Sequence, residues 1–325
     1  MSLRDEQRGR PTPARERELR LTRERIAALG SLVVVAAAVV VVIVLSSVGG
    51  SGSHPSHHSH PSVTASGGTP SGGSVPRGTA QPGTTAVPIL VYHVINARPA
   101  QSTALPALYI PVGEFSSQMA ALKASGWHAV TLDQLEANWT RGVSLGSGKP
   151  IVLTFDNGYA SQYTNALPVL KGLGWVGVED LQLSGLPPSE GGLTDTQIRG
   201  LLAAGWELAT QGISHADLTT LDTAQLTNKL ASARQTLRSR YGVPVNWFSY
   251  PSGDYDATVI AAVRAAGYVG ATTVNPGWAS PRQGRFRLPR LVVTGGTTPS
   301  QLLAQIDAAK ATTSIPSAYN GPGLA

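Results

Sequence analysis

Polar residues of the types that carry out acid/base chemistry follow several strand-like segments of this chain. Ile151–Phe155 is an apolar and β-branched run that leads directly into Asp156, Asn157 and Gly158. In a parallel α/β sheet, the carboxyl ends of the strands open on one face. We therefore expect Asp156 to be the first candidate for a general base. The other polar groups that follow strand candidates are His93, Gln211, His215, the Tyr250–Gly253 turn, and Asn275 with Trp278.

Each of these residues also has an ordinary structural interpretation. A histidine can sit in a loop, an aspartate can cap a helix and a Pro-Gly pair can form a turn. Asn157-Gly158 is moreover the commonest type of hairpin turn. The segment after it, Tyr159–Leu170, favours a loop and a short helix over a returning strand. The set as a whole therefore indicates a site more strongly than any single member.

The elements that must position these groups alternate between strands and helices from Val87 onward. One phrase recurs three times, at residues 124–127, 203–206 and 265–268, where a helix ends at glycine and an aromatic residue begins a strand. Thr194 with Gln197 predicts a capping box. This alternation predicts a mostly parallel sheet, either a barrel or doubly wound. The later strand candidates are residues 207–210, 247–250, 270–274 and 290–293.

Composition restricts the class of protein. The 325 residues are 42% hydrophobic and 14% charged, enough for one domain with a proper core besides its tails. The net charge is +6, but eight arginines and five acidic residues place +3 of it in the first 25 positions. A basic nucleic-acid-binding face is therefore not expected. The absence of cysteine excludes disulfides and thiolate metal sites.

The N-terminal third predicts a membrane tether. Residues 26–48 form an uncharged apolar run long enough to cross a bilayer of ~30 Å, and the Arg-rich residues 1–25 should stay in the cytoplasm. A cleaved signal peptide is the alternative. Residues 49–86 have the composition of a flexible spacer, although His54, His57, His58 and His60 are an alternative metal-binding cluster. The globular domain is expected at 87–312, followed by a flexible tail at 313–325.

Four segments, in the right order and spacing, carry a resemblance to one family. Thr154–Gly158 is similar to the Thr-Phe-Asp-Asp-Gly motif of the polysaccharide deacetylases with a NodB homology domain, the fourth family of carbohydrate esterases. Gln211–His215 resembles that family's His-Ser/Thr-x-x-His motif, and Phe248–Gly253 resembles its Arg-x-Pro-Tyr-Gly segment. Pro88–His93 resembles the opening strand of the branch with biofilm poly-glucosamine deacetylases. The resemblance covers residues 87–310 and implies a distorted (β/α) barrel.

The resemblance also implies roles for individual residues. In the family the first Asp is the general base, while the second Asp and two His bind a divalent metal, usually zinc. At the matching positions Asp156 is the base and His215 is one ligand, but the other two ligand positions hold Asn157 and Gln211. Neutral amide oxygens are weak substitutes for zinc ligands, so we expect zinc to bind weakly or not at all.

Further departures concern the rest of the site. Ser249 stands where the family has an arginine, Ser252 stands for its aromatic residue, and no histidine follows Arg290 as a late general acid. His93 is the remaining candidate acid if its strand lies beside Ile151–Phe155. The segment 176–183 contains Glu179 and Asp180, where relatives have an apolar strand. We expect an edge strand or a shifted strand here, and the sequence alone gives no physical reason for the two carboxyl groups.

Three functions follow from this sequence. The first is a weakened metal-dependent hydrolase of N-acetyl groups on an envelope or extracellular glycan. The second is a non-catalytic relative that binds the glycan, with Ser252 and the aromatic residues Tyr250, Tyr255 and Trp278 as the contact surface. The third is a tethered structural or interaction protein with a vestigial groove. In each case the expected partners are an N-acetylated polysaccharide and the lipid bilayer, with the domain outside the cytoplasm.

Overall fold

The computed structural model describes residues 81–100, 102, 105–186 and 190–321. The predicted cytoplasmic tail, the predicted membrane helix, most of the predicted spacer and its four histidines lie outside these residues. Among the described residues, no helix combines the length and the apolar character needed to cross a bilayer.

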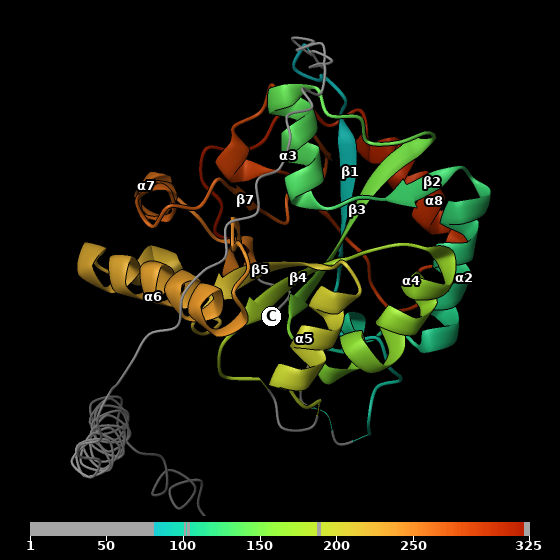
Figure 1. Cartoon of the computed structure of the whole chain (residues 1–325), viewed down its shortest axis with the longest axis horizontal. Helices are drawn as coiled ribbons and strands as arrows, with labels where there is room; N and C mark the ends of the chain where they lie inside the picture. Colours follow the sequence, from blue (N-terminus) through green and yellow to red (C-terminus); the bar gives the residue numbers. More distant parts are fainter. Residues whose placement is uncertain (1–80, 101, 103–104, 187–189, 322–325) are drawn as a thin grey trace, which may run out of the picture. The chain divides into compact units, whose positions relative to one another are not determined.

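Nine strands form a single, mostly parallel sheet (Figure 1). Seven of them follow the order β7-β6-β5-β4-β3-β1-β8, while β2 pairs with β3 and β9 pairs with β1. Within the described residues, β8 is antiparallel to β1 and the other pairs are parallel. The strands are β1 (Val87–Tyr92), β2 (Trp127–Ala129), β3 (Lys149–Asn157), β4 (Val178–Gln182), β5 (Glu207–Gly212), β6 (Trp247–Ser249), β7 (Gly270–Thr272), β8 (Trp278–Ala279) and β9 (Leu291–Val292).

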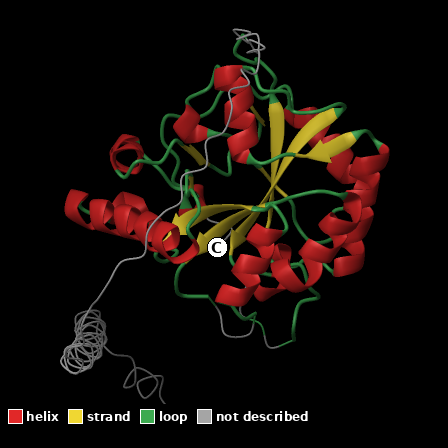
Figure 2. Cartoon of the chain, in the orientation of Figure 1, coloured by secondary structure: helices red, strands yellow, loops and turns green. Residues whose placement is uncertain are grey.

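Helices follow most strands and cover the outer face of the sheet (Figure 2). They are α2 (Val112–Ala124), α3 (Leu132–Arg141), α4 (Leu167–Leu173), α5 (Asp195–Ala203), α6 (Thr223–Tyr241), α7 (Ala257–Ala265) and α8 (Pro299–Ala309), with short turns η1 (Pro106–Leu108), η2 (Gln162–Ala166), η3 (Leu218–Thr220), η4 (Pro251–Gly253) and η5 (Arg285–Arg287). The predicted α/β alternation is confirmed, and the sheet is a curled half-barrel with β7 and β8 at opposite ends of its order.

Local sequence signals explain where several helices begin and end. The predicted capping box of Thr194 and Gln197 is present at the start of α5. Gly126, Gly205 and Gly267 follow α2, α5 and α7 with φ of 82°, 85° and 84°, as expected for the three repeated junctions. Asn157-Gly158 does not form a hairpin, because helical turns follow it and η2 leads into α4.

The strand that carries Glu179 and Asp180 is interior rather than an edge strand. β4 pairs with β3 on one side and with β5 on the other, and all five of its residues are buried. The expectation of an edge or shifted strand is therefore wrong. Two adjacent carboxyl groups hide the strand in the sequence. The partner of Asp180 is Arg290, from a distant segment, and within the described residues the Glu179 carboxyl oxygens have no hydrogen-bond partner.

Alternation along the strands divides the sheet into two faces. The outer side chains of β1 and β3, such as Tyr92 and Phe155, pack against Phe115 of α2, and the Tyr92 hydroxyl donates to Gln118. On the inner side, the amino-terminal half of the half-barrel is apolar and is capped by α3. Its core contains Val87, Ile89, Val130, Leu132, Leu135, Trp139, Val152, Val178, Ala209, Trp247, Ala279 and Leu288.

The segment after α8 packs against the domain. Tyr319 pairs with Tyr255 through two backbone hydrogen bonds of 2.8 Å, and the Tyr255 hydroxyl donates to the Pro316 carbonyl. The Gly321 N–H donates to Asp254. The described part of the predicted tail is thus held beside the loop that follows β6.

Candidate functional site

Asp156 is buried at the carboxyl end of β3 and is held by an arginine. Arg290 Nη1 donates to Asp156 Oδ1 at 2.7 Å, and Arg290 Nη2 donates to Asp156 Oδ2 at 3.0 Å. Both side chains are almost fully buried, with exposed fractions of 0% and 4%. This is a two-point guanidinium–carboxylate pair, the strongest common form of charged hydrogen bonding in proteins.

The other N–H groups of Arg290 are also occupied. Nε donates to the Thr273 carbonyl, Nη1 contacts Thr154 Oγ1 and Asp180 Oδ2, and Nη2 donates to Ser249 Oγ. A guanidinium group has five N–H donors, so these partners use its full capacity. Arg290 therefore joins β3, β4 and β6 in the interior of the curled sheet and has no N–H left for a ligand.

The two amide side chains at the implied metal-ligand positions act as hydrogen-bond donors. Gln211 Nε2 donates to Asp156 Oδ2 at 2.8 Å, and Asn157 Nδ2 donates to Gln182 Oε1 at 3.1 Å. An ionised carboxylate only accepts hydrogen bonds, so Gln211 must direct its NH₂ group towards Asp156. Within the described residues, Gln211 Oε1 has no hydrogen-bond partner.

The charges in this network are distributed unequally. Burial alone would raise the pKa of Asp156, but the Arg290 guanidinium and its hydrogen bonds hold it below the usual range. Asp180 also contacts Arg290, yet burial and the neighbouring Asp156 charge raise its pKa well above the usual range. One guanidinium group cannot neutralise two carboxylates, and Asp156 has the two-point contact. We infer an ionised Asp156 beside a protonated Asp180.

Two neutral imidazoles lie around this carboxylate. Tyr92 pairs with Phe155 across β1 and β3, so His93 follows β1 directly beside Asp156. Burial lowers the pKa of His93 to about 4, despite the nearby Asp156 charge. Burial likewise lowers the pKa of His215. The predicted adjacency of His93 and Asp156 is confirmed, but a neutral imidazole at pH 7 is not a preformed general acid.

Gln162 ties the ends of β1 and β3 together. It is completely buried in the π-helical turn η2, and its Nε2 donates to the carbonyls of His93 and Asp156 at 3.0 and 2.7 Å. Ser161 and Asn165 in the same segment bond the backbone of Ile95. Single π-helical turns occur frequently at functional sites because they aim side chains that a regular helix would not.

His215 contacts the turn that follows β6. The Ser252 N–H lies 3.4 Å from His215 Nε2 and points its hydrogen at that atom. Ser252 has φ of 54°, a left-handed conformation that a residue other than glycine adopts only when its surroundings hold it there. Asp254 and Asp156 both act electrostatically on His215, which places the imidazole between these two carboxyl groups.

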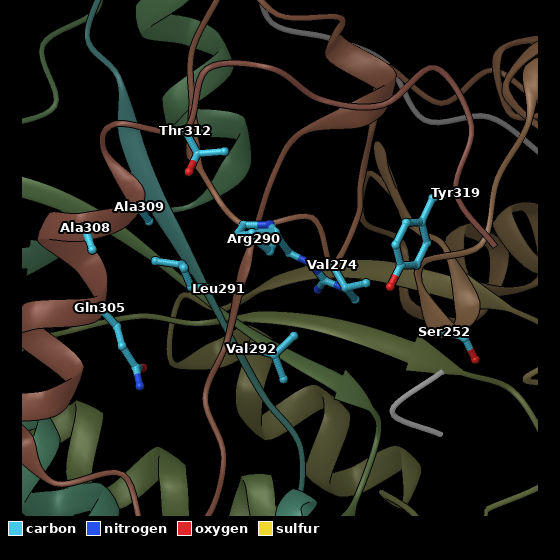
Figure 3. A pocket seen from close by; sticks show the side chains of 11 residues that line it. Ser252, Val274, Arg290, Leu291, Val292, Gln305, Ala308, Ala309, Thr312 and Tyr319 are labelled. Atoms are coloured by element: carbon cyan, nitrogen blue, oxygen red, sulfur yellow. The ribbon is translucent and has the colours of Figure 1, made fainter. Parts of the chain in front are cut away.

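A cavity of about 530 Å³ lies next to Arg290 and Ser252 (Figure 3). In Figure 3, Gln305, Ala308 and Ala309 of α8 line one side and Ser252 and Tyr319 the other, with Val292 of β9 between them. Arg290 is the one charged residue among its lining residues. A cavity of this volume with mainly apolar walls and a few polar groups suits an uncharged small ligand or one sugar residue.

Comparisons with known proteins agree with this architecture. Residues 145–271 match the family profile for polysaccharide deacetylase. The polysaccharide deacetylase-family protein YxkH of Bacillus subtilis is 28% identical over 224 residues, which are 69% of this chain and 77% of YxkH. Residues 145–271 therefore carry a polysaccharide deacetylase domain, and the curated and structural homologues of the chain are polysaccharide deacetylases.

Solved structures show the same fold. The deacetylase PplD of Streptococcus pyogenes, in complex with acetate, superimposes with a TM-score of 0.63 at 24% identity over 69% of this chain and 99% of PplD. The polysaccharide deacetylase-family protein BA0330 of Bacillus anthracis gives a TM-score of 0.61 at 26% identity over 69% of each chain.

The residues of this chain do not fit a zinc site of the implied type. The described residues contain no group of three or more His, Asp or Glu side chains arranged to hold a metal ion. Of the three implied ligand positions, His215 alone carries a usual zinc donor. Gln211 donates its NH₂ group to Asp156, and its amide oxygen is a weak substitute for the imidazole that the resemblance implies.

Three of the residues predicted to bind substrate do not form a contact surface at Asp156. Tyr250 is 1% exposed and its hydroxyl donates to the Phe286 carbonyl, while Tyr255 is 0% exposed. Trp278 pairs with Pro88 at the amino end of β1, and its Nε1 donates to Ile306. The interpretation of Tyr250 and Tyr255 as stacking surfaces is wrong, because both are core residues with a buried polar group. Trp278 is half-buried, and its role as a glycan contact stays a prediction.

The structure adds residues that the sequence did not reveal as part of the site. These are Arg290 and Gln162, which bond Asp156 or its backbone, and Asp180, which bonds Arg290. The sequence signal that could have revealed Arg290 was Ser249. The family has an arginine at this position, whereas this chain has a short hydroxyl side chain, which Arg290 contacts from another segment.

Proposed function

We propose that this chain is a membrane-anchored, extracytoplasmic member of the polysaccharide deacetylase family that binds an N-acetylated glycan without zinc-dependent hydrolysis. One observation carries the proposal: both Asp156 oxygens are engaged by donors, from Arg290 and Gln211. An effective general base has a pKa near the working pH. Asp156 accepts hydrogen bonds at three of its four lone-pair sites and its pKa is lowered, so it is a weak base.

The glycan-binding part of the proposal is supported by the cavity beside Ser252. Its walls combine aliphatic side chains with the polar groups of Gln305, Ser252 and Thr312. A pyranose ring with an acetamido group presents the same mixture, apolar ring faces and methyl beside hydroxyl and amide groups. The saturated Arg290 offers no free charge, which suits a neutral acetylated sugar.

The anchoring part of the proposal depends on residues 1–48. The uncharged run at 26–48 after an Arg-rich segment supports a single span with the domain outside the cytoplasm. Protease added to intact cells should remove the globular domain. Complete protection of the domain would contradict the orientation.

Zinc titration of the purified full chain tests the catalytic part. We expect no tight stoichiometric zinc in calorimetry and elemental analysis. The double variant Asn157→Asp with Gln211→His rebuilds the implied ligand set around His215, so it should bind zinc at least ~100-fold more tightly, because inner ligands contribute more than outer partners do. Tight zinc binding by the natural chain that is lost in His215→Ala would overturn the proposal.

Pelleting with insoluble chitin, a neutral N-acetylated polysaccharide, tests the binding part. Ala308→Trp should fill the cavity and reduce pelleting about tenfold or more, whereas Ala304→Trp, one turn away on the same helix and exposed, should leave it unchanged. Absence of pelleting by the natural chain, or equal loss in both variants, would contradict binding at this cavity.

A further inference from the structure

The chain enters the domain along one edge of α3. The Gly83 N–H donates to the Asn138 carbonyl at 2.8 Å, and Trp139 Nε1 donates to the Thr85 carbonyl at 2.8 Å. Asn138 Nδ2 in turn donates to the Val143 carbonyl in the loop after α3. Figure 1 shows α3 at the end of the domain where β1 begins. The first described residues, 81–83, therefore exit the domain beside the loop that carries Val143.

Exposed cations surround this exit. Arg141 and Lys149 bracket the loop that carries Val143, the most exposed of the large apolar residues described, at 47%. Lys149 Nζ lies 5.5 Å from the Trp127 ring centre, and Lys310 Nζ lies 5.2 Å from that of Trp278.

The two tryptophan rings are 5.8 Å apart, which brings Lys149 and Lys310 to one edge. Arg282, also exposed, follows β8, whose Ala279 pairs with the first residue of β1. We call Arg141, Val143, Lys149, Arg282 and Lys310 the amino-end rim.

The acidic residues at this end offset the cations only in part. The Asp133 carboxylate accepts hydrogen bonds from Asn246 and Trp247, and Glu136 forms an ion pair of 2.9 Å with Arg285. Burial raises the pKa of Glu207 to about 8, so this residue is mostly uncharged at pH 7. Asp307, another acidic residue near the rim, is exposed. The rim therefore presents net positive charge around an apolar tip.

The opposite end of the sheet has the reverse charge. The loops after β5 and β6 carry Asp217 and Asp222, together with the buried Asp254 close to His215. Anionic lipid headgroups attract cations within a Debye length of the surface and repel such acids. One orientation on an anionic bilayer is thus favoured over the other.

We propose that the amino-end rim docks onto the anionic bilayer that anchors the chain, with Val143 in the headgroup layer and the cations against lipid phosphates. This inference rests on the membrane anchoring in the proposed function. It goes beyond that function, because it fixes which end of the domain meets the lipid. Asp156 lies seven residues along β3 from Lys149, so docking holds the site about 23 Å farther from the membrane than the rim.

Site-specific fluorescence tests the orientation, and the absence of cysteine makes labelling unambiguous. Full-length Val143→Cys, labelled with an environment-sensitive dye, is reconstituted into vesicles of phosphatidylcholine with 30% phosphatidylglycerol (a chosen composition) or of phosphatidylcholine alone. The matched control is Thr220→Cys, exposed in the turn η3 at the opposite end. The Val143 label should shift to the blue and be quenched by spin-labelled lipid in the anionic vesicles alone, and the Thr220 label should stay in water.

Charge removal provides the second arm of the test. Each neutralised cation should weaken docking about fivefold, so Arg141→Gln, Lys149→Gln, Arg282→Gln and Lys310→Gln together should abolish the shift. The same four substitutions should leave chitin pelleting unchanged, which separates failure of docking from failure of glycan binding. A Val143 label that stays in water in anionic vesicles overturns the proposal. A chain that does not co-float with vesicles after an alkaline wash overturns the anchoring and the docking together.

Discussion

The two halves of the half-barrel interior differ in their chemistry. Towards the amino end, the inner side chains of β1, β3, β4 and β6 are aliphatic or aromatic, as at Ile89, Val152, Val178 and Trp247, and α3 covers them. Towards the carboxyl end, the same strands place Asp156, Asp180 and Ser249 around Arg290. The first half stabilises the fold by removing apolar surface from water. The second half buries charges whose desolvation costs about as much as their pairing returns.

The difference concerns how each half responds when a side chain is lost. A buried ion network is weak evidence for stability, because apolar residues of similar volume often serve as well. Removing one partner of such a network, in contrast, leaves an uncompensated buried charge. The comparison therefore predicts that the two halves differ in whether a second substitution rescues the first, and in the sign of their pH dependence.

The largest effect is expected for Arg290→Met, which leaves the ionised Asp156 buried without its partner. We expect the free energy of unfolding to fall by about 3–5 kcal/mol, measured by urea denaturation of the full chain. Asp156→Asn combined with Arg290→Met removes both charges and should recover most of the loss. A loss below about 1 kcal/mol for Arg290→Met alone would mean that the network is solvated or loosely packed.

In the apolar half, Leu288→Ala should lower the free energy of unfolding by about 3 kcal/mol, because the fully buried side chain leaves a cavity. Unlike Arg290→Met, this variant should not be rescued by any change at Asp156. The measurement is the same denaturation series with the double variant Leu288→Ala and Asp156→Asn. If the losses in the free energy of unfolding are additive, the two halves of the interior are independent. A double variant whose loss differs strongly from the sum of the two single losses would refute the comparison.

The pH dependence should differ between the two ends. Glu207, at the amino end, has a pKa raised from 4.5 to about 8, so the folded chain holds a proton there that the unfolded chain releases. Stability contributed by this proton is present below pH 4.5 and is lost as pH rises towards 8. Glu207→Gln should reduce the loss between pH 5 and 8 by about 3 kcal/mol, because each unit of raised pKa corresponds to about 1.4 kcal/mol. If Glu207→Gln leaves the dependence of the free energy of unfolding on pH unchanged, Glu207 is ionised in the folded chain.

Asp156 should show the opposite sign. Its pKa is lowered by Arg290, so its stabilisation is present above the ordinary aspartate range and is lost as pH falls through the lowered value. Carbon-detected NMR of the side-chain carboxyls should therefore show Asp156 titrating below pH 3.8. Titration above that value would reverse the assignment of the ionised carboxylate to Asp156 rather than Asp180.

The smallest effect is expected for Trp278→Ala in the chitin assay. Trp278 lies at the amino end of β1, far along the strand from His93, so pelleting should stay within about twofold of the natural chain. Because the substitution removes packing against Trp127, the assay must be normalised to the folded fraction by circular dichroism. A specific loss of pelleting would restore Trp278 as a glycan contact and extend the binding surface to the other end of the sheet.

Local signals in the sequence predicted the alternation of strands and helices, whereas the barrel-like arrangement was implied by the family resemblance alone. Gly126, Gly205 and Gly267 mark junctions that the structure reproduces, and the Ile151–Phe155 run marks the strand before Asp156. These features depend on residues close in sequence, which is why pattern and propensity found them. The same reasoning failed for β4. Asp180 is tolerated inside the sheet because it contacts Arg290, and this partner is 110 residues away in the sequence, beyond the reach of local patterns.

The site was predicted in part for the same reason. The positions of His93 and Asp156 at adjacent strand ends followed from the strand pattern, and the loss of ligand chemistry at Asn157 and Gln211 was evident from residue type. The sequence could not show that the Gln211 amide donates to Asp156, because that contact depends on a fold-dependent side-chain orientation. Aromatic residues such as Tyr250 were assigned to the surface, although a buried carbonyl accepts their hydroxyl.

The contact between Gly321 and Asp254 has a practical consequence for handling the protein. Asp254 is close enough to His215 to alter its pKa, so the last described residues of the chain lie beside the candidate site. A bulky group attached at Gly321 would therefore compete for the space that a glycan needs.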